Sequence, residues 1–156
     1  MKERIYVCHS FYHIYVSFLK ELNLPKEQRG NATLVVSHMS TDFGDFPERI
    51  RKFGFFEEVV DFDEKHERCF PELAKYRQKE KNFIKSTLNR IKFPKKFARL
   101  QAEYIPVDFK QYKDIYVFCD SDPIGFYLNA NRIYYHAIED GLNCLKNGNL
   151  AHLDNI

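Results

Sequence analysis

The sequence predicts an α/β domain built on a Rossmann-like, doubly wound parallel sheet. Short apolar runs, which read as strands, alternate along the whole chain with segments of helical periodicity. Apolar strands separated by helices indicate a parallel sheet covered on both faces, because right-handed crossovers place the helices there. The length of 156 residues suits one domain, so we expect a single domain over residues 1–156.

The first half of the chain supplies three of the predicted strands. In order, we expect a strand over residues 5–8, a helix over 11–22, a strand over 32–36, a short helix over 47–52 and a strand over 57–62. Ser10 is a suitable N-cap for the first helix, and Leu24-Pro25 closes it. Gly54 ends the second helix.

Residues 64–103 interrupt this alternation with a predicted helical, basic insertion. Ile84, Leu88 and Ile91 share one face at helical spacing, and Pro94 is expected to break the helix, giving two or three helices in all. After the insertion we expect a strand over residues 114–119, a helix over 124–128 and a strand over 132–138.

The insertion also concentrates positive charge. It holds twelve of the chain's 24 Lys and Arg residues against five acids, so one side of the molecule should be basic. Such a surface could meet phosphates, anionic lipid or an acidic glycan, and the alternative is a solvated helical face. Phe83, Phe93 and Phe97 would supply a surface for a homo-oligomer if they are exposed. We expect no nucleic-acid partner.

Several classes of protein find no support in the sequence. No apolar stretch is long enough to span a bilayer or to act as a secretion signal, which predicts a cytoplasmic protein, at most peripheral to a membrane. The four cysteines lack metal-ligand spacing, so we expect reduced, mostly buried thiols and no metal. The GxGxxG, P-loop, HExxH, GxSxG and EF-hand patterns are absent.

Polar residues follow four of the predicted strands. In parallel sheets of this type, ligands bind beyond the carboxyl ends of the strands, so these residues are the candidate site. They are His9 and Ser10, Ser37 and His38, Asp120 to Asp122, and Glu139 to Gly141.

Glu139 and Asp140 are the strongest candidates for catalysis. Adjacent residues at a strand end point in different directions, but Gly141 permits a turn that brings both carboxylates to one place. A carboxylate at an apolar lip can have a raised pKa and act as the base for a sugar hydroxyl. The alternative is an ordinary solvated turn.

The segment Asp120-Ser121-Asp122 has the spacing of a DxD motif, which in many sugar-transferring enzymes holds a divalent metal. Asp122 precedes Pro123, however, and this pair favours a helix N-cap. The role of Asp120 stays open. His9, beside a helix N-terminus, is a candidate substrate contact, whereas packing or surface roles are expected for His13 and a structural role for His136.

Three stretches, IYVCHSFYHIYVSFLKEL, CDSDPIGFYLN and above all AIEDGLNC, resemble the bacterial sialyltransferases of glycosyltransferase family 52, which are related to the bacterial polysialyltransferases. The resemblance covers most of the chain, with gaps in the insertion. Its most specific element is the acidic-acidic-glycine motif at residues 139–141, supported by the stretch from His9 to His13 that includes Tyr12.

The resemblance implies one half of a GT-B enzyme, in which two Rossmann-like domains face a cleft and transfer sialic acid from CMP-sialic acid to a glycan acceptor. It implies no cofactor beyond this donor, and a place in lipooligosaccharide or capsule biosynthesis. It assigns deprotonation of the acceptor first to Asp140 and second to Glu139. We expect substrate binding by His9, Ser10, Tyr12, Asp120, Ser121 and Gly141.

The sequence departs from the family at one motif. The family binds the CMP phosphate with a His-Pro pair, and none of the six histidines here precedes a proline. We therefore expect the chain to be an acceptor-side, N-terminal domain that lacks the C-terminal donor-binding domain and is inactive alone. Two alternatives remain, namely another nucleotide-sugar glycosyltransferase with a DxD-like metal site, and a non-catalytic module that binds glycan or membrane.

Overall fold

The computed structural model describes residues 1–78 and 82–138, which form an α/β domain around a parallel sheet. The sheet has five strands in the order β3-β2-β1-β4-β5, and every neighbouring pair is parallel. The strands are β1 (Lys2–Cys8), β2 (Ala32–Ser37), β3 (Glu58–Phe62), β4 (Tyr112–Val117) and β5 (His136–Ala137). The predicted fold class, α/β with a parallel sheet, is confirmed.

The order of the strands creates a topological switch point beside β1. The chain runs outward from β1 through β2 to β3, and β4 then returns to pair with the other side of β1. Ile5 thus stands in register with Thr33 of β2 and with Ile115 of β4. In open parallel sheets, the crevice between strands that lead in opposite directions is where ligands bind. Here that switch point lies at the carboxyl ends of β1 and β4.

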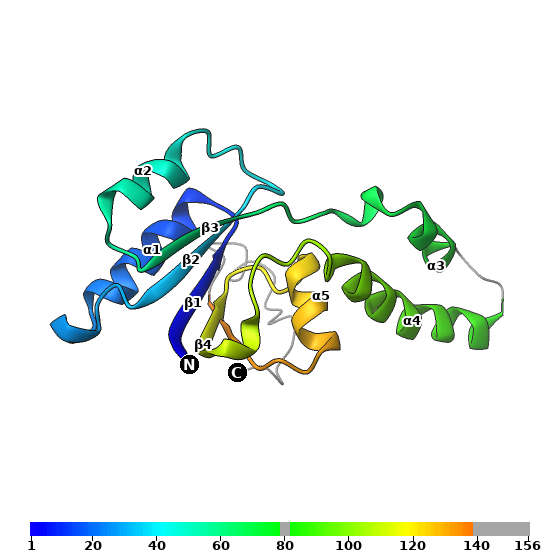
Figure 1. The fold of residues 1–156 in the computed structure, drawn as a ribbon. Coiled ribbons are helices and arrows are strands. Elements are labelled where there is room, and N and C mark those ends of the chain that lie inside the picture. The colour runs from blue at the N-terminus through cyan, green and yellow to red at the C-terminus, as the bar shows by residue number, and fades with distance from the viewer. Residues whose placement is uncertain (79–81, 139–156) are drawn as a thin grey trace.

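Helices cover both faces of the sheet, and β1 shows why (Figure 1). Ile5 and Val7 pack in one core with Ile124 of α5 (Pro123–Ala130), whereas Tyr6 and Cys8 pack in a second core on the other face. That second core includes helices α1 (Phe11–Leu22) and α2 (Phe46–Phe53). Alternate side chains of a strand point to opposite faces, so a strand covered on both faces is apolar throughout.

A buried ion pair fixes α1 to the sheet. The Arg4 guanidinium donates to both carboxylate oxygens of Glu21, at 2.7 and 3.2 Å, and the Tyr6 hydroxyl donates to the same carboxylate at 2.8 Å. Burial and this carboxylate raise the pKa of the Tyr6 hydroxyl. Nearby, burial raises the pKa of the Cys8 thiol to about 12. The Tyr6 hydroxyl and the Cys8 thiol therefore keep their protons at neutral pH.

The chain between β3 and β4 forms an arm that extends from one side of the sheet (Figure 1). It contains α3 (Ala74–Arg77) and α4 (Phe83–Gln101), together with short 3₁₀ turns. The arm has its own apolar cluster, made of Phe70, Leu73, Phe93 and Phe97, and Phe126 of α5 packs against this cluster. The described part of this segment thus includes two α-helices.

Two predictions about local structure in the second half of the chain are wrong. Helix α4 continues through Pro94 instead of breaking there. A proline inside a helix removes one backbone hydrogen bond, and the burial of Phe93 and Phe97 on either side of it compensates for that loss. Burial also removes these two phenylalanines from any oligomer surface, whereas Phe83 is exposed.

The last strand is also shorter than predicted, with two residues in place of residues 132–138. The preceding residues close α5 in a Schellman arrangement. The Ile133 N–H donates to the Leu128 carbonyl at 3.0 Å, and Arg132 adopts a left-handed conformation with φ of 55°. Their backbone groups therefore bond to the helix and not to β4. None of the helices in residues 1–78 and 82–138 combines the length and the hydropathy that a membrane span requires.

Candidate functional site

A buried histidine and a buried glutamate meet at the switch point. His9 directly follows β1, and Glu64 follows β3 by two residues. The His9 Nε2 lies 2.6 Å from Glu64 Oε2, and the two side chains are 2% and 0% exposed. The carboxyl ends of two strands that are not neighbours are therefore joined by one side-chain contact.

The Glu64 carboxylate also receives two further donors. The Ser37 hydroxyl at the end of β2 donates to Oε2 at 2.7 Å, and the Ile124 N–H in the first turn of α5 donates to Oε1 at 2.6 Å. A buried carboxylate is strongly destabilising unless its oxygens are hydrogen-bonded, and the N-terminus of a helix favours a negative charge. Glu64 thus connects β1, β2 and α5 at one point.

These contacts fix the orientation of the His9 ring. An ionised carboxylate only accepts hydrogen bonds, so we assign the proton on Nε2 to the contact with Glu64. In the neutral ring, Nδ1 then carries the lone pair. A carboxylate that holds an imidazole in one tautomer is a recurring device in acid-base sites, because the second nitrogen can then take up a proton.

His13 and Cys119 lie next to this pair. His13, one turn into α1, is 2% exposed and stacks on Phe118 with ring centroids 4.4 Å apart. The backbone N–H of His9 donates to His13 Nδ1 at 3.0 Å. One ligand atom each from His9, His13 and Cys119 lies within 4.8 Å of the others, an arrangement that could hold a metal such as zinc.

The hydrogen bond to His13 argues against that metal. Since Nδ1 of His13 accepts a hydrogen bond from the backbone N–H of His9, its Nε2 carries the proton of the neutral ring. A metal at Nε2 would require the loss of that proton, and a metal at Nδ1 would have to displace the His9 N–H. His13 therefore does not fit as a ligand in this geometry. The prediction of a protein without a metal remains a prediction.

The three residues predicted to bind substrate after the first strand have different surroundings in the structure. His9 lies at the centre of the cluster. Ser10 caps α1, because its hydroxyl accepts the His13 N–H at 3.3 Å. Tyr12 is 46% exposed on α1, where its ring touches that of His13 edge-on. A ligand could reach Tyr12 from solvent, whereas the Ser10 hydroxyl is used to cap α1.

The residues after β4 lie at the same edge of the sheet. Asp120 is half-buried and accepts a hydrogen bond from the Tyr135 hydroxyl at 3.4 Å, and Ser121 is exposed. Asp122 occupies the N-cap position of α5 with Pro123 in the first turn, as predicted, but its side chain makes no capping hydrogen bond. The carboxylate that bonds to the first turn of α5 belongs to Glu64, and Asp122 Oδ2 instead lies 3.8 Å from His9 Nε2.

The acidic motif Glu139, Asp140 and Gly141 lies outside the described residues. In the chain it follows β5, whose last residue, Ala137, pairs with Val117 at the end of β4. Ser37 joins the cluster through Glu64, whereas His38 bonds to Asp61 at 2.8 Å. His136 lies in β5 and stacks on Tyr116, in line with its predicted structural role.

Sequence reasoning missed Glu64, whose carboxylate contacts His9, Ser37 and the Ile124 N–H. The signal existed, because Glu64 follows a predicted strand like the other candidates, but it was assigned to the insertion. Of the three cysteines in the described residues, Cys8 is buried, Cys119 is half-buried and Cys69 is exposed, so the expectation of mostly buried cysteines is only partly met there. An open hollow of about 430 Å³ lies elsewhere, between α5 and the loop that precedes β4.

Comparisons of the chain with protein-family models, with curated proteins and with solved structures return no match.

Proposed function

We propose that this chain is the acceptor-side domain of a glycosyltransferase that resembles the sialyltransferases of family 52. The observation that supports it is the His9–Glu64 pair, with Nε2 and Oε2 2.6 Å apart at the switch point of a parallel sheet. The acidic motif follows β5 in the chain, and β5 pairs with β4. A proton-accepting group at this edge is what transfer to a sugar hydroxyl requires.

In the proposed reaction, the acceptor hydroxyl loses its proton to Asp140, and its oxygen forms a bond to the anomeric carbon of sialic acid. The bond from that carbon to the CMP phosphate breaks, and CMP leaves with the electron pair. Glu139 is the second choice as base. Tyr12, Asp120 and Ser121 line the approach of the acceptor. The donor would bind to a second Rossmann-like domain, as the resemblance implies.

The first test is a transfer assay on the protein from its native reading frame. It measures labelled sialic acid passing from CMP-sialic acid to a panel of glycans. We expect Asp140→Asn to lower turnover by roughly 10²- to 10⁴-fold, the usual contribution of a general base, while binding of the donor persists. The matched control is Asp45→Asn, which removes an exposed acid that makes no capping bond to α2.

Unchanged turnover in Asp140→Asn would remove this residue as the base, and no transfer to any glycan by the native protein would remove the proposed activity. The same assay addresses the alternative with a DxD-like metal site at Asp120 and Asp122. Loss of transfer on adding a chelator, restored by a divalent cation, would favour that alternative.

A further inference from the structure

Helix α4 presents an apolar stripe to solvent along the arm. Ile84, Leu88 and Ile91 follow one another at helical spacing and are 69%, 46% and 54% exposed. Phe83, at the start of the helix, is 83% exposed. Large aliphatic side chains gathered on one face of a surface helix usually mark a binding surface, whereas scattered ones do not.

The opposite face of α4 is packed against the rest of the arm, so the exposed stripe is not the face that α4 buries. Phe93 and Phe97 are 6% and 2% exposed in the cluster of the arm. The Arg77 guanidinium of α3 lies 4.2 Å from the centre of the Phe93 ring, and Phe126 of α5 contacts Phe93 and Phe97 edge-on and tilted. The helix is therefore held in place by one face while the other meets solvent.

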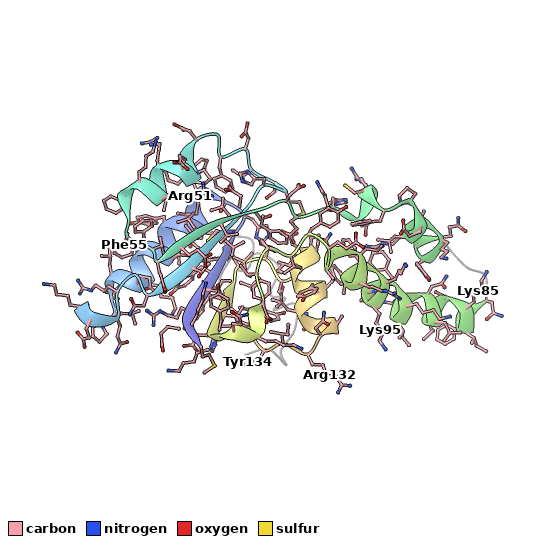
Figure 2. The ribbon with its side chains drawn as sticks, in the orientation of Figure 1. Arg51, Phe55, Lys85, Lys95, Arg132 and Tyr134 are labelled. Atoms are coloured by element: carbon pink, nitrogen blue, oxygen red, sulfur yellow. The ribbon has the colours of Figure 1, made fainter. Side chains whose placement is uncertain are left out.

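The charge of α4 has one sign. Its 19 residues include Lys85, Arg90, Lys92, Lys95, Lys96 and Arg99, and no Asp or Glu. The spacing of Lys95 and Arg99 continues the line of Ile84, Leu88 and Ile91, and Lys92 flanks it. Figure 2 shows Lys95 on the side of α4 away from α3, with Arg132 beyond the end of α5 on the same side of the molecule. The apolar stripe thus runs into a basic surface.

The chemistry of this face selects its partner. A second copy of α4 would set one row of cations against another, which is unfavourable. Protein interfaces favour aromatic residues and Arg over Lys, but four of the six cations here are Lys and the stripe is aliphatic. A nucleic-acid duplex would engage the cations through its phosphates but would leave the apolar stripe without a partner, and single strands are usually held by stacking on aromatic rings. A bilayer with anionic headgroups meets both the stripe and the charges, and the long stems of Lys can reach its phosphates.

We propose that α4 lies flat on an anionic lipid surface, with Ile84, Leu88 and Ile91 among the acyl chains and Lys92, Lys95 and Arg99 at the headgroups. Binding of this kind needs two contributions together, apolar burial and electrostatic attraction. It does not depend on the glycosyl transfer proposed above.

The test is co-sedimentation of the 156-residue chain with vesicles of phosphatidylcholine, alone or mixed with phosphatidylglycerol. We expect binding only to the mixed vesicles, and a steep decrease as salt rises. Replacing Lys92, Lys95 and Arg99 by Gln should weaken binding roughly 100-fold, as expected for three headgroup contacts. Replacing Ile84, Leu88 and Ile91 by Ser should weaken it at least about tenfold.

Control variants carry the same types of substitution on other surfaces of the molecule. Lys26, Lys52 and Lys110, all exposed and away from α4, are replaced together by Gln, and Phe53, which is 70% exposed on α2, by Ser. Circular dichroism verifies that each variant is folded. Equal binding by the α4 and control variants would overturn the proposal. So would sedimentation of a dimer that the α4 changes abolish, or tight binding to heparin or RNA without binding to the vesicles.

Discussion

At the scale of single residues, the organisation of the site depends on Glu64. Its carboxylate accepts hydrogen bonds from His9, Ser37 and the Ile124 N–H at 2.6 to 2.7 Å, while the side chain is 0% exposed. Removing one member of a buried, charged network costs more than the network contributes, because the remaining groups lose their partners. We therefore expect the largest local effect from a change at this position.

Glu64→Gln keeps the shape of the side chain but removes its charge. We expect the free energy of unfolding to fall by roughly 1–3 kcal/mol, the cost of weakening buried hydrogen bonds of a charged group. The ring of His9 should also lose its single tautomer. Urea titration measures the first effect, and ¹⁵N chemical shifts of the imidazole measure the second.

Glu67→Gln is the control, because this glutamate contacts the exposed Arg77 at the surface. Equal stability of the wild type and Glu64→Gln, with an unchanged His9 spectrum, would show that the contact between Glu64 and His9 does not orient the ring.

The rules of strand ends and caps predict that His9 follows the first strand and that Ser10 is the N-cap of the first helix, because both positions are set by the adjacent strand and helix. They do not reveal Glu64, because the course of the loop after β3 decides whether its side chain meets His9 and Ile124. Nor do they show that Glu64, and not Asp122, bonds to the first turn of α5. Such contacts join residues 55 and 60 positions apart, and local patterns carry no information about them.

At the scale of elements, the close approach of α5 to the loop after β4 positions the polar residues of that loop. An added Cβ at Gly125 would lie 1.7 Å from the Asp120 carbonyl oxygen and 2.4 Å from its carbon. Both are backbone atoms, so a side chain at Gly125 would push the helix and the loop apart. The glycine in the segment SDPIGF is therefore required by packing.

Gly125→Ala tests this approach by the sign of its effect. In an unhindered helix, the change stabilises by about 0.5–1 kcal/mol. Here we expect destabilisation of roughly 1–3 kcal/mol, the usual cost of overpacking. Thermal unfolding measures it, with Asn131→Ala at the exposed end of the same helix as the control. A more stable Gly125→Ala protein would contradict the close packing.

The type of each element follows from its pattern, whereas some of the boundaries do not. Alternation of apolar strands and amphipathic helices is a local property, so strands β1 to β4 and helices α1, α2 and α5 are predictable. Pro94 was expected to end α4, but burial of Phe93 and Phe97 outweighs the lost hydrogen bond. Residues 132–135 are apolar enough for a strand, yet Arg132 and Ile133 close α5 instead.

At the scale of the whole molecule, the described residues contain three apolar clusters that differ in whether they pack on the sheet. Two of them lie on opposite faces of the sheet and share its strands, whereas the third belongs to the arm. The arm is joined to the sheet mainly through α5, by way of Phe126. A part with its own small core and one main attachment should open more easily than the sheet.

Hydrogen exchange followed by mass spectrometry tests this difference. We expect amides of α3 and α4 to exchange before those of β1 and β2. Phe97→Ala should destabilise the packing of the arm by about 3–5 kcal/mol. We therefore expect the amides of the arm to lose their protection from exchange, while the amides of the sheet keep it. A uniform loss of protection across β1 and β2 in this variant would show that the arm and the sheet unfold as one unit.

The parallel sheet is predictable from the sequence because it depends only on the number and type of the elements. The order of the strands is not, since it depends on contacts between distant segments. The arm is predictable as a basic helical segment, but its exposed stripe is identified only when burial shows which face of α4 packs.

The hydrogen bond from the Ile124 N–H to Glu64 also limits what can bind at the switch point. The positive end of α5 already holds a negative group that the chain itself supplies. A free phosphate arriving there would have to displace a tethered competitor, whose effective concentration is on the order of millimolar or more. A neutral, hydroxyl-rich molecule faces no such competition, so we expect this helix end to accept neutral ligands more readily than anions.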